Sequence, residues 1–185
     1  MGYGLMCAMG RGQRPLLQSK GGFMNTQKYP PHAKDLRKGR CSINHQVYLI
    51  TTVTYQRQRV FDDFTLGRMV IQAMRQQVQQ QKIKSLAFVL MPDHLHWLLS
   101  LENNSQLADV MRCTKGISAH KIQAIRRQSG DIVRHQALWQ DGYYDRAIRK
   151  EEDLQQVARY VVANPLRAKL VNKVADYPLW DAVWL

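Results

Sequence analysis

Two apolar runs on either side of a Pro-Asp pair constrain the fold of this chain more than any other feature. The runs are SLAFVLM, residues 85–91, and LHWLLSL, residues 95–101, and Pro92-Asp93 stands between them. Proline fixes its own φ and aspartate hydrogen-bonds to nearby backbone, so the pair favours a tight reversal. Short runs this apolar are typical of buried strands. The segment therefore predicts a hairpin inside a sheet.

Further strand and helix patterns flank this hairpin. QVYLITTVTY, residues 46–55, is dense in β-branched and aromatic residues and predicts a first strand. Apolar residues recur at three- and four-residue steps within 63–82 and predict a helix. A second amphipathic helix is expected over 106–127, with Ser105 as its N-cap.

The C-terminal third of the chain predicts one more strand and one more helix. The strand is expected within WQDGYYDRAIR, residues 139–149. The helix should run from Lys150 or Glu151 to Asn164 and stop at Pro165, with three acidic residues, 151–153, complementing its N-terminal dipole. The resulting order, β-α-β-β-α-β-α, predicts an α+β fold: a ferredoxin-like split βαβ arrangement with an additional C-terminal helix.

The charge balance favours a polyanionic partner. Lys and Arg number 27 against 14 Asp and Glu, which leaves a net charge of +13. Such an excess is typical of proteins that bind nucleic acid or an acidic membrane face. Because the cations are spread along the chain, we expect a DNA or RNA groove on the folded domain. No stretch approaches the roughly 20 apolar residues of a membrane span, so we expect no membrane partner and a cytoplasmic, nucleoid-associated location.

The N-terminal residues differ in composition from the rest. Residues 1–40 are rich in Gly, Pro, Lys and Arg without apolar periodicity, and predict a basic, flexible tail before a single domain over 41–185. The sequence leaves open whether Met1 or Met24 is the true start. Three cysteines without a C-x-x-C spacing indicate neither a disulfide framework nor a zinc knuckle.

The residues best suited to chemistry are His94, His96, Tyr160 and Asn164. Alternation along a strand directs His94 and His96 to one face, and four-residue spacing puts Tyr160 and Asn164 on one face of a helix. Two imidazole nitrogens and an amide oxygen suit Mg²⁺ or Mn²⁺ with open positions. Structural roles remain open: ordinary strand histidines, a packing tyrosine, and an asparagine that ends the helix before Pro165.

These motifs together resemble a known family. HLH after the MPDH turn, followed by RYVVANPLRAKLV, resembles the HUH single-strand DNA transposases with one catalytic tyrosine, and among them the REP-associated tyrosine transposases. The segment LRKGRCSINHQVYLITTVTYQRQRVF is similar to the first strand of that family and to the basic residues that precede it. The resemblance spans roughly Leu36 to Trp180.

The resemblance implies roles for the same residues. His94, His96 and Asn164 would be the metal ligands and Tyr160 the nucleophile, although wider relatives often carry glutamine at the third-ligand position. The implied reaction cuts and rejoins single-stranded DNA through a 5′-phosphotyrosine. The implied substrate is a hairpin with a short single-stranded guide, as in repetitive extragenic palindromes. The implied protein is a monomer or homodimer.

Cationic and aromatic residues are expected to contact the DNA. Lys and Arg would chiefly meet phosphates, and tyrosines could stack on unpaired bases. The expected DNA-binding residues are Arg37, Lys38, Arg40, Lys115, Lys121, Arg126, Arg127, Tyr143, Tyr144, Arg146 and Arg149. Arg159 is a further cation beside Tyr160.

Two other functions fit part of the pattern. A non-catalytic DNA- or RNA-binding module could share the element order, because RNA-recognition folds have it, but SLAFVLM lacks their aromatic signature. A metal-dependent hydrolase could instead use water as the nucleophile, with Tyr160 structural. A covalent protein–DNA adduct distinguishes the tyrosine nuclease from both.

Overall fold

The computed structural model describes residues 44–129, 137–149 and 152–184. The predicted tail over 1–40, with Arg37, Lys38 and Arg40, lies outside these residues. The described elements follow in the order β1 Val47–Val53, η2 Tyr55–Arg57, η3 Val60–Asp62, α1 Phe64–Gln79, β2 Ile83–Met91, β3 His94–Leu101, α2 Leu107–Gln128, β4 Tyr144–Ala147, α3 Leu154–Val162, α4 Asn164–Arg167, η4 Val174–Asp176 and β5 Trp180–Ala182.

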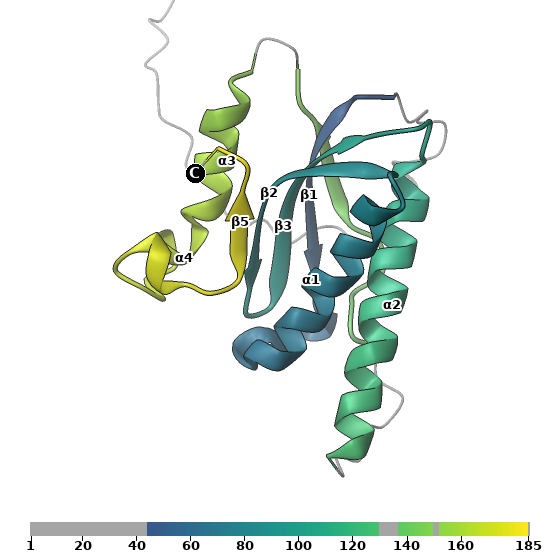
Figure 1. Cartoon of the computed structure of the whole chain (residues 1–185). Helices are drawn as coiled ribbons and strands as arrows, with labels where there is room; N and C mark the ends of the chain where they lie inside the picture. Colours follow the sequence, from purple (N-terminus) through teal and green to yellow (C-terminus); the bar gives the residue numbers. More distant parts are fainter. Residues whose placement is uncertain (1–43, 130–136, 150–151, 185) are drawn as a thin grey trace, which may run out of the picture. The chain divides into compact units, whose positions relative to one another are not determined.

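The strands form one antiparallel sheet in the order β4-β1-β3-β2-β5 (Figure 1). The hairpin predicted around Pro92-Asp93 is β2-β3, and β3 lies between β1 and β2, as a split βαβ unit requires. The predicted α+β fold is confirmed. The sequence prediction missed β5, because three residues are too few to show strand alternation.

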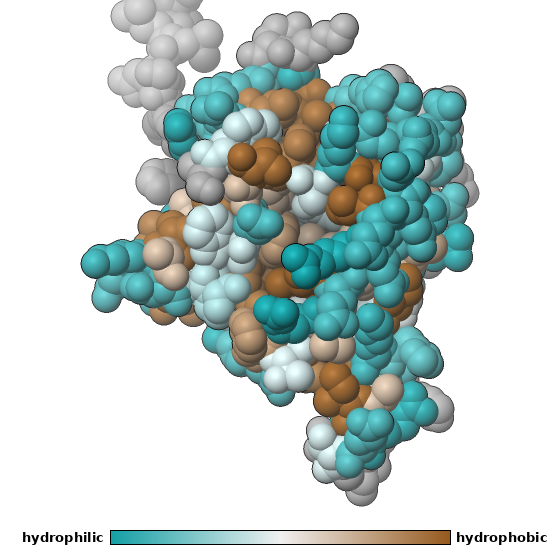
Figure 2. All heavy atoms as spheres, viewed as in Figure 1, coloured by the Kyte–Doolittle hydropathy of each residue, from teal (hydrophilic) through white to brown (hydrophobic). Residues whose placement is uncertain are grey.

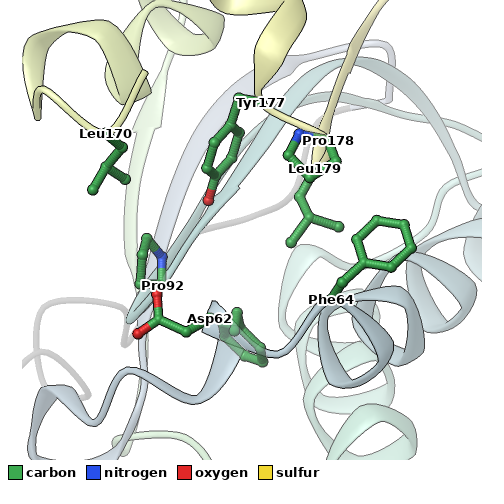
Figure 3. Close-up of a pocket in the computed structure, with 8 residues that line it drawn as sticks. Asp62, Phe64, Pro92, Leu170, Tyr177, Pro178 and Leu179 are labelled. Atoms are coloured by element: carbon green, nitrogen blue, oxygen red, sulfur yellow. The ribbon is translucent and has the colours of Figure 1, made fainter.

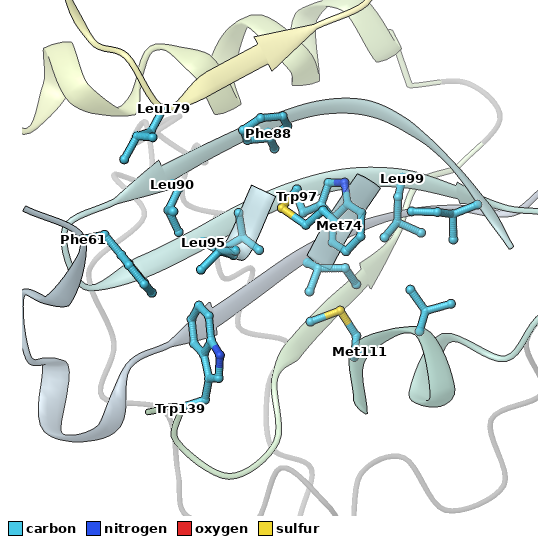
Figure 4. Packing of buried hydrophobic residues seen from close by; sticks show 14 of the residues in the cluster. Phe61, Met74, Phe88, Leu90, Leu95, Trp97, Leu99, Met111, Trp139 and Leu179 are labelled. Atoms are coloured by element: carbon cyan, nitrogen blue, oxygen red, sulfur yellow. The ribbon is translucent and has the colours of Figure 1, made fainter. Parts of the chain in front are cut away.

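Helices α1 and α2 cover one face of the sheet (Figure 1). Alternate residues of β3, namely Leu95, Trp97 and Leu99, point into the core beneath these helices (Figure 4). Trp97 is fully buried, and its indole N–H donates to the Ser85 hydroxyl at 3.0 Å. The main hydrophobic core therefore lies between this face and the two helices.

The N-termini of α1 and α2 are built differently. The Asp63 carboxylate caps α1 by accepting hydrogen bonds from the backbone N–H groups of Thr65 and Leu66. The predicted Ser105 cap of α2 is wrong. Gln106 occupies the N-cap position without a side-chain cap bond, and the Ser105 N–H instead donates to Glu102 in the preceding turn.

Helix α3 packs on the opposite face of the sheet. Its buried residues Ala158 and Val162 join Ala87, Leu98 and Ile148 in a second, smaller apolar cluster. A further buried residue, Val161, contacts the end of β2. The sheet thus carries α1 and α2 on one face and α3 on the other.

The predicted last helix is shorter at both ends than expected. It begins at Leu154, and the Asp153 carboxylate caps it by accepting hydrogen bonds from the backbone N–H groups of Gln155 and Gln156. Glu152 lies before the cap, outside the helix in which it was expected, and accepts from the Arg149 N–H and the Arg146 guanidinium. Lys150 and Glu151 lie outside the described residues.

Pro165 does not end the helical path, contrary to prediction. It lies in the first turn of α4, where proline is tolerated because no helical partner is needed for its missing N–H. The chain therefore makes one more helical turn beyond Asn164, and this turn carries Arg167.

The surface seen in Figure 2 is mainly hydrophilic, with apolar side chains in small patches between the polar ones. In the described part of the chain, no helix combines the length and the apolar character that crossing a bilayer requires.

Candidate active site

His94 and His96 lie together on the α3 face of β3. Their ring centroids are 4.8 Å apart, in an edge-to-face arrangement. Leu95 and Trp97 point into the core on the opposite face. The alternation predicted from the sequence is therefore confirmed.

His96 is held on the sheet by a hydrogen bond with a residue of the neighbouring strand. Its Nδ1 lies 2.9 Å from the hydroxyl oxygen of Thr51, its register partner on β1. Burial, helped by the positive charges of His94 and Arg167, lowers the pKa of His96 from 6.5 to about 3. The imidazole is neutral at pH 7 and keeps a lone pair, as a metal ligand requires.

His94 contacts a carboxylate. Its Nδ1 lies 2.5 Å from Asp93 Oδ1, and the other carboxylate oxygen accepts from the Arg57 guanidinium at 3.0 Å. Burial by itself would raise the pKa of Asp93, but the hydrogen bond with His94 and the pairing with Arg57 outweigh it, so that this pKa is lowered. Asp93 is thus a carboxylate at neutral pH.

The C-terminal end of α3 lies over the sheet beside the histidines. Val161 packs on Val89 and Met91, which are the β2 register partners of His96 and His94. Asn164 follows Val161 by three residues, so both share one side of the helical path. The asparagine Nδ2 donates to the Val161 carbonyl oxygen at 2.7 Å, which leaves its side-chain oxygen as the acceptor.

This donor set fits a divalent metal ion of the Mg²⁺ or Mn²⁺ type. Each histidine Nδ1 already has a partner, so Nε2 is the nitrogen left for a ligand bond. The described residues contain no group of three or more His, Cys, Asp and Glu side chains suited to a metal. A third ligand from this part of the chain would be of another type, and the Asn164 oxygen is one.

Tyr160 lies one residue before Val161 and is 45% exposed. The Arg167 guanidinium carbon stacks 3.9 Å from the centroid of its ring, and Arg167 also donates to the Tyr160 carbonyl oxygen at 2.9 Å. Arg167 was missed by the sequence prediction, since the helix was expected to stop at Pro165. No local pattern indicated this contact, because Pro165 stands between Tyr160 and Arg167 in the sequence.

A row of side chains crosses the sheet at His96. Tyr144 on β4 pairs with Thr51 on β1, and Thr51 pairs with His96 on β3. Tyr144 is 51% exposed, whereas its neighbour Tyr143 packs against the main core. We call the face of the sheet that carries His94 and His96 the histidine face. Of the two predicted stacking tyrosines, only Tyr144 lies on it.

Comparisons with known proteins identify the family. The family model described as IS200-like transposase matches residues 42–164, which is more than half of the chain. The chain belongs to this transposase family.

Two relatives add to this result. A protein of Haemophilus influenzae assigned as a REP-associated tyrosine transposase is 26% identical over 110 residues, covering 57% of this chain. The chain spans 62% of the length of that relative. A solved REP-associated tyrosine transposase bound to a REP hairpin matches with a TM-score of 0.60 at 22% identity, over 76% of this chain and 79% of the other. At this identity the match confirms the fold.

The predicted DNA-binding cations of the chain are divided between regions. Lys115 on α2 donates to the Gln140 and Gly142 carbonyl oxygens at 2.6 and 2.7 Å, and so supports the loop before β4. Lys121, Arg126 and Arg127 also lie on α2, the helix that packs on the face of the sheet opposite the histidines.

The cations of β4 and its C-terminal side are nearer the candidate site. Arg146 pairs in register with Leu49, which packs against the α3-side clusters. It also forms an ion pair with Glu152 at 2.6 Å. Arg149 is exposed two residues beyond β4. Arg146 therefore lies on the same face as the histidines, where Glu152 pairs with its charge.

The described part of the chain also has a small pocket beside the β2-β3 turn. Its volume is about 260 Å³, and its walls include Phe61, Asp62, Pro92 and Tyr177 (Figure 3). The Tyr177 hydroxyl donates to the Leu90 carbonyl oxygen at 2.7 Å, and burial raises its pKa to about 12. Tyr177 thus ties the C-terminal segment to the strand that precedes the turn.

Proposed function

We propose that this transposase cuts and rejoins single-stranded DNA beside a hairpin, with Tyr160 as the nucleophile. In this proposal His94, His96 and Asn164 hold a Mg²⁺ or Mn²⁺ ion, and the covalent intermediate is a 5′-phosphotyrosine. Membership of the IS200-like transposase family supports a reaction on DNA.

One observation supports the site more than any other: the packing of Val161. This residue stands between Tyr160 and Asn164 in the chain and contacts the strand partners of both histidines. Two sequence segments more than 60 residues apart are thereby brought to one side of the sheet. The nucleophile and all three proposed ligands belong to these two segments.

The reaction is a transesterification at phosphorus. The Tyr160 oxygen forms a bond to the phosphorus while the bond to the 3′-oxygen breaks, and in sum the phenol proton passes to that oxygen. The products are a 5′-phosphotyrosine and a free 3′-hydroxyl. Because the phosphodiester energy is kept, attack by a 3′-hydroxyl reverses the step and joins a strand without ATP.

A tyrosine hydroxyl is a weak nucleophile at neutral pH and needs nearby positive charge. Arg167, stacked on the Tyr160 ring, supplies such charge and orients the phenol. The metal ion, when bound, would polarise the scissile phosphate and neutralise charge that develops on it. The two histidines and Asn164 would hold it with open positions for phosphate oxygens.

The proposed substrate is a hairpin with a single-stranded flank. The solved relative bound to a REP hairpin supports this choice, as does the net charge of +13. Tyr144, exposed and two strands from His96, is suited to stack on an unpaired base near the scissile phosphate.

The packing of α3 argues against a non-catalytic RNA-recognition module. Such a module binds RNA on the sheet face that its helices leave open. Here α3 packs on that face, where it contacts β2, β3 and β5.

The test is adduct formation with a single-stranded hairpin oligonucleotide in the presence of Mn²⁺. We expect the wild-type chain to give a slow-migrating protein–DNA band on a denaturing gel, and mass spectrometry to locate the DNA on the Tyr160 peptide. Tyr160→Phe keeps the ring and should fold and bind the hairpin, but form no adduct. Tyr144→Phe is the matched control and should retain the adduct.

Three outcomes would overturn the proposal in different ways. An adduct that persists in Tyr160→Phe would assign the nucleophile elsewhere. Cleavage without any adduct would indicate a hydrolase in which water attacks. Hairpin binding without cleavage by the wild-type chain would indicate a binding module.

A further inference from the structure

Asp93, the second residue of the β2-β3 turn, is held at four points. Its carbonyl oxygen accepts from the backbone N–H of Thr54 at 2.9 Å and from the Thr54 hydroxyl at 3.0 Å. Its carboxylate contacts His94 Nδ1 through Oδ1 and Arg57 through Oδ2. Thr54 and Arg57 follow β1, so the segment after one strand positions a carboxylate in the turn between two others.

The chemistry of this contact determines the form of His94. A carboxylate accepts hydrogen bonds and has no proton to donate. The hydrogen of the Asp93–His94 bond must therefore be on Nδ1 of the imidazole. The neutral ring then has its lone pair on Nε2, the nitrogen that remains for a metal ion.

The hydrogen-bond partner of His96 does not determine which ring nitrogen carries the hydrogen. The Thr51 hydroxyl lies 2.9 Å from His96 Nδ1, and a hydroxyl can either donate or accept. Thr51 thus orients the ring without selecting which nitrogen carries the hydrogen. The two histidines of one strand differ in how strictly their metal-binding form is imposed.

We propose that Asp93, supported by Arg57, is a positioning residue that keeps His94 in the Nδ1–H form and presents Nε2 to the metal ion. The proposal rests on the metal site of the proposed function. It predicts that Asp93 contributes to metal affinity without touching the ion, and that Thr51 contributes less. Outer partners of metal-binding histidines typically change affinity by about 10- to 100-fold.

The experiment combines two measurements on the full chain. Nitrogen-15 NMR of the metal-free protein reports which ring nitrogen of His94 carries the hydrogen. Calorimetric titration with Mn²⁺ reports affinity. We expect Asp93→Ala to give a mixture of the two His94 forms and to weaken Mn²⁺ binding about 10- to 100-fold. Asp93→Asn, whose amide can still accept, should give a smaller loss, as should Thr51→Val.

The control is Asp109→Asn, which removes a carboxylate that is also paired with an arginine, Arg112, but lies on α2 across the sheet. It should leave both readouts unchanged. Asp93→Asn keeps the side-chain shape and carries the test if Asp93→Ala does not fold.

A separate variant, His94→Ala, distinguishes this inference from the proposed function. If His94→Ala abolishes Mn²⁺ binding while Asp93→Ala and Asp93→Asn bind as the wild type does, the role of Asp93 is refuted and the metal site stands. If His94→Ala also binds Mn²⁺ normally, the metal site itself is refuted, and the role of Asp93 with it.

Discussion

The two faces of the sheet are built from alternate residues of the same strands but differ in what they bury. The face under α1 and α2 carries Leu95, Trp97 and Leu99 of β3 in one continuous apolar core. The face under α3 carries His94, His96 and Leu98, and its apolar residues form two smaller clusters. Period-two alternation lets one strand serve both faces.

This difference separates stability from chemistry. Apolar burial under α1 and α2 holds β3 rigidly, and a rigid strand keeps side chains on its other face in register. The histidine face can then retain polar groups and exposed residues that contribute little to folding. Substitutions on one face should therefore alter folding, and substitutions on the other should alter metal and DNA binding.

The sharpest test of this separation compares adjacent residues of β3. Trp97→Ala should lower the free energy of unfolding by about 3–5 kcal/mol, because it leaves a cavity in the main core. His96→Ala should cost only about 1 kcal/mol at pH 7, because it loses one hydrogen bond, yet abolish Mn²⁺ binding. Denaturant unfolding and calorimetry measure the two effects. Equal destabilisation by both variants would contradict the comparison.

Acid should lower the stability of the metal-free protein through His96. His96 has a pKa of about 3 in the folded state and 6.5 as a free side chain. Below pH 6.5, His96 therefore binds a proton in the unfolded chain but not in the folded chain. Stability should fall by up to about 1.4 kcal/mol per pH unit from pH 6.5 toward pH 3. The lowered pKa of Asp93 acts separately, below its ordinary value of 3.8.

Denaturant unfolding at pH 7, 6 and 5 measures this dependence. His96→Gln should flatten it, while His120→Gln, on the exposed surface of α2, should not. A wild-type stability that stays constant from pH 7 to 5 would show that His96 can be protonated in the folded state.

Tyr144 tests whether the histidine face extends to the edge strand. Tyr144→Ala should weaken binding to a hairpin with a single-stranded flank by about 1–3 kcal/mol, which is the usual worth of one stacked base. Tyr144→Phe keeps the ring and should bind as the wild type does. Fluorescence anisotropy at fixed salt measures both affinities. Equal affinity of the wild type and both variants would show that Tyr144 does not contact the DNA.

The smallest expected effect lies in the apolar face. Gln77 continues the buried stripe of α1, and its side-chain amide has no hydrogen-bond partner among the described residues. Burying an unpaired polar group is unfavourable, so Gln77→Met should raise the free energy of unfolding by about 1 kcal/mol. A loss of stability would indicate that the amide is hydrogen-bonded, for instance to a buried water.

Much of the scaffold could be predicted from local pattern. Some features depend only on residues that are neighbours along the chain, and their periodicity can be read directly from the sequence. These are the β2-β3 hairpin, the helical stripe of α1 and the shared face of His94 and His96. The family resemblance carried by HLH and YVVANP is confirmed. The single domain over 41–185, the metal, the nucleophile and the choice between monomer and dimer stay predictions.

The remaining features were decided by tertiary structure. No local pattern indicates that α3 packs on the histidine face, that Arg57 supports Asp93, or that Arg167 stacks on Tyr160 beyond a proline. Each depends on how distant segments fill space against one another, and a helix or strand period specifies only which face is apolar. The residues suited to chemistry were therefore visible in the sequence, whereas their partners and orientation came from packing.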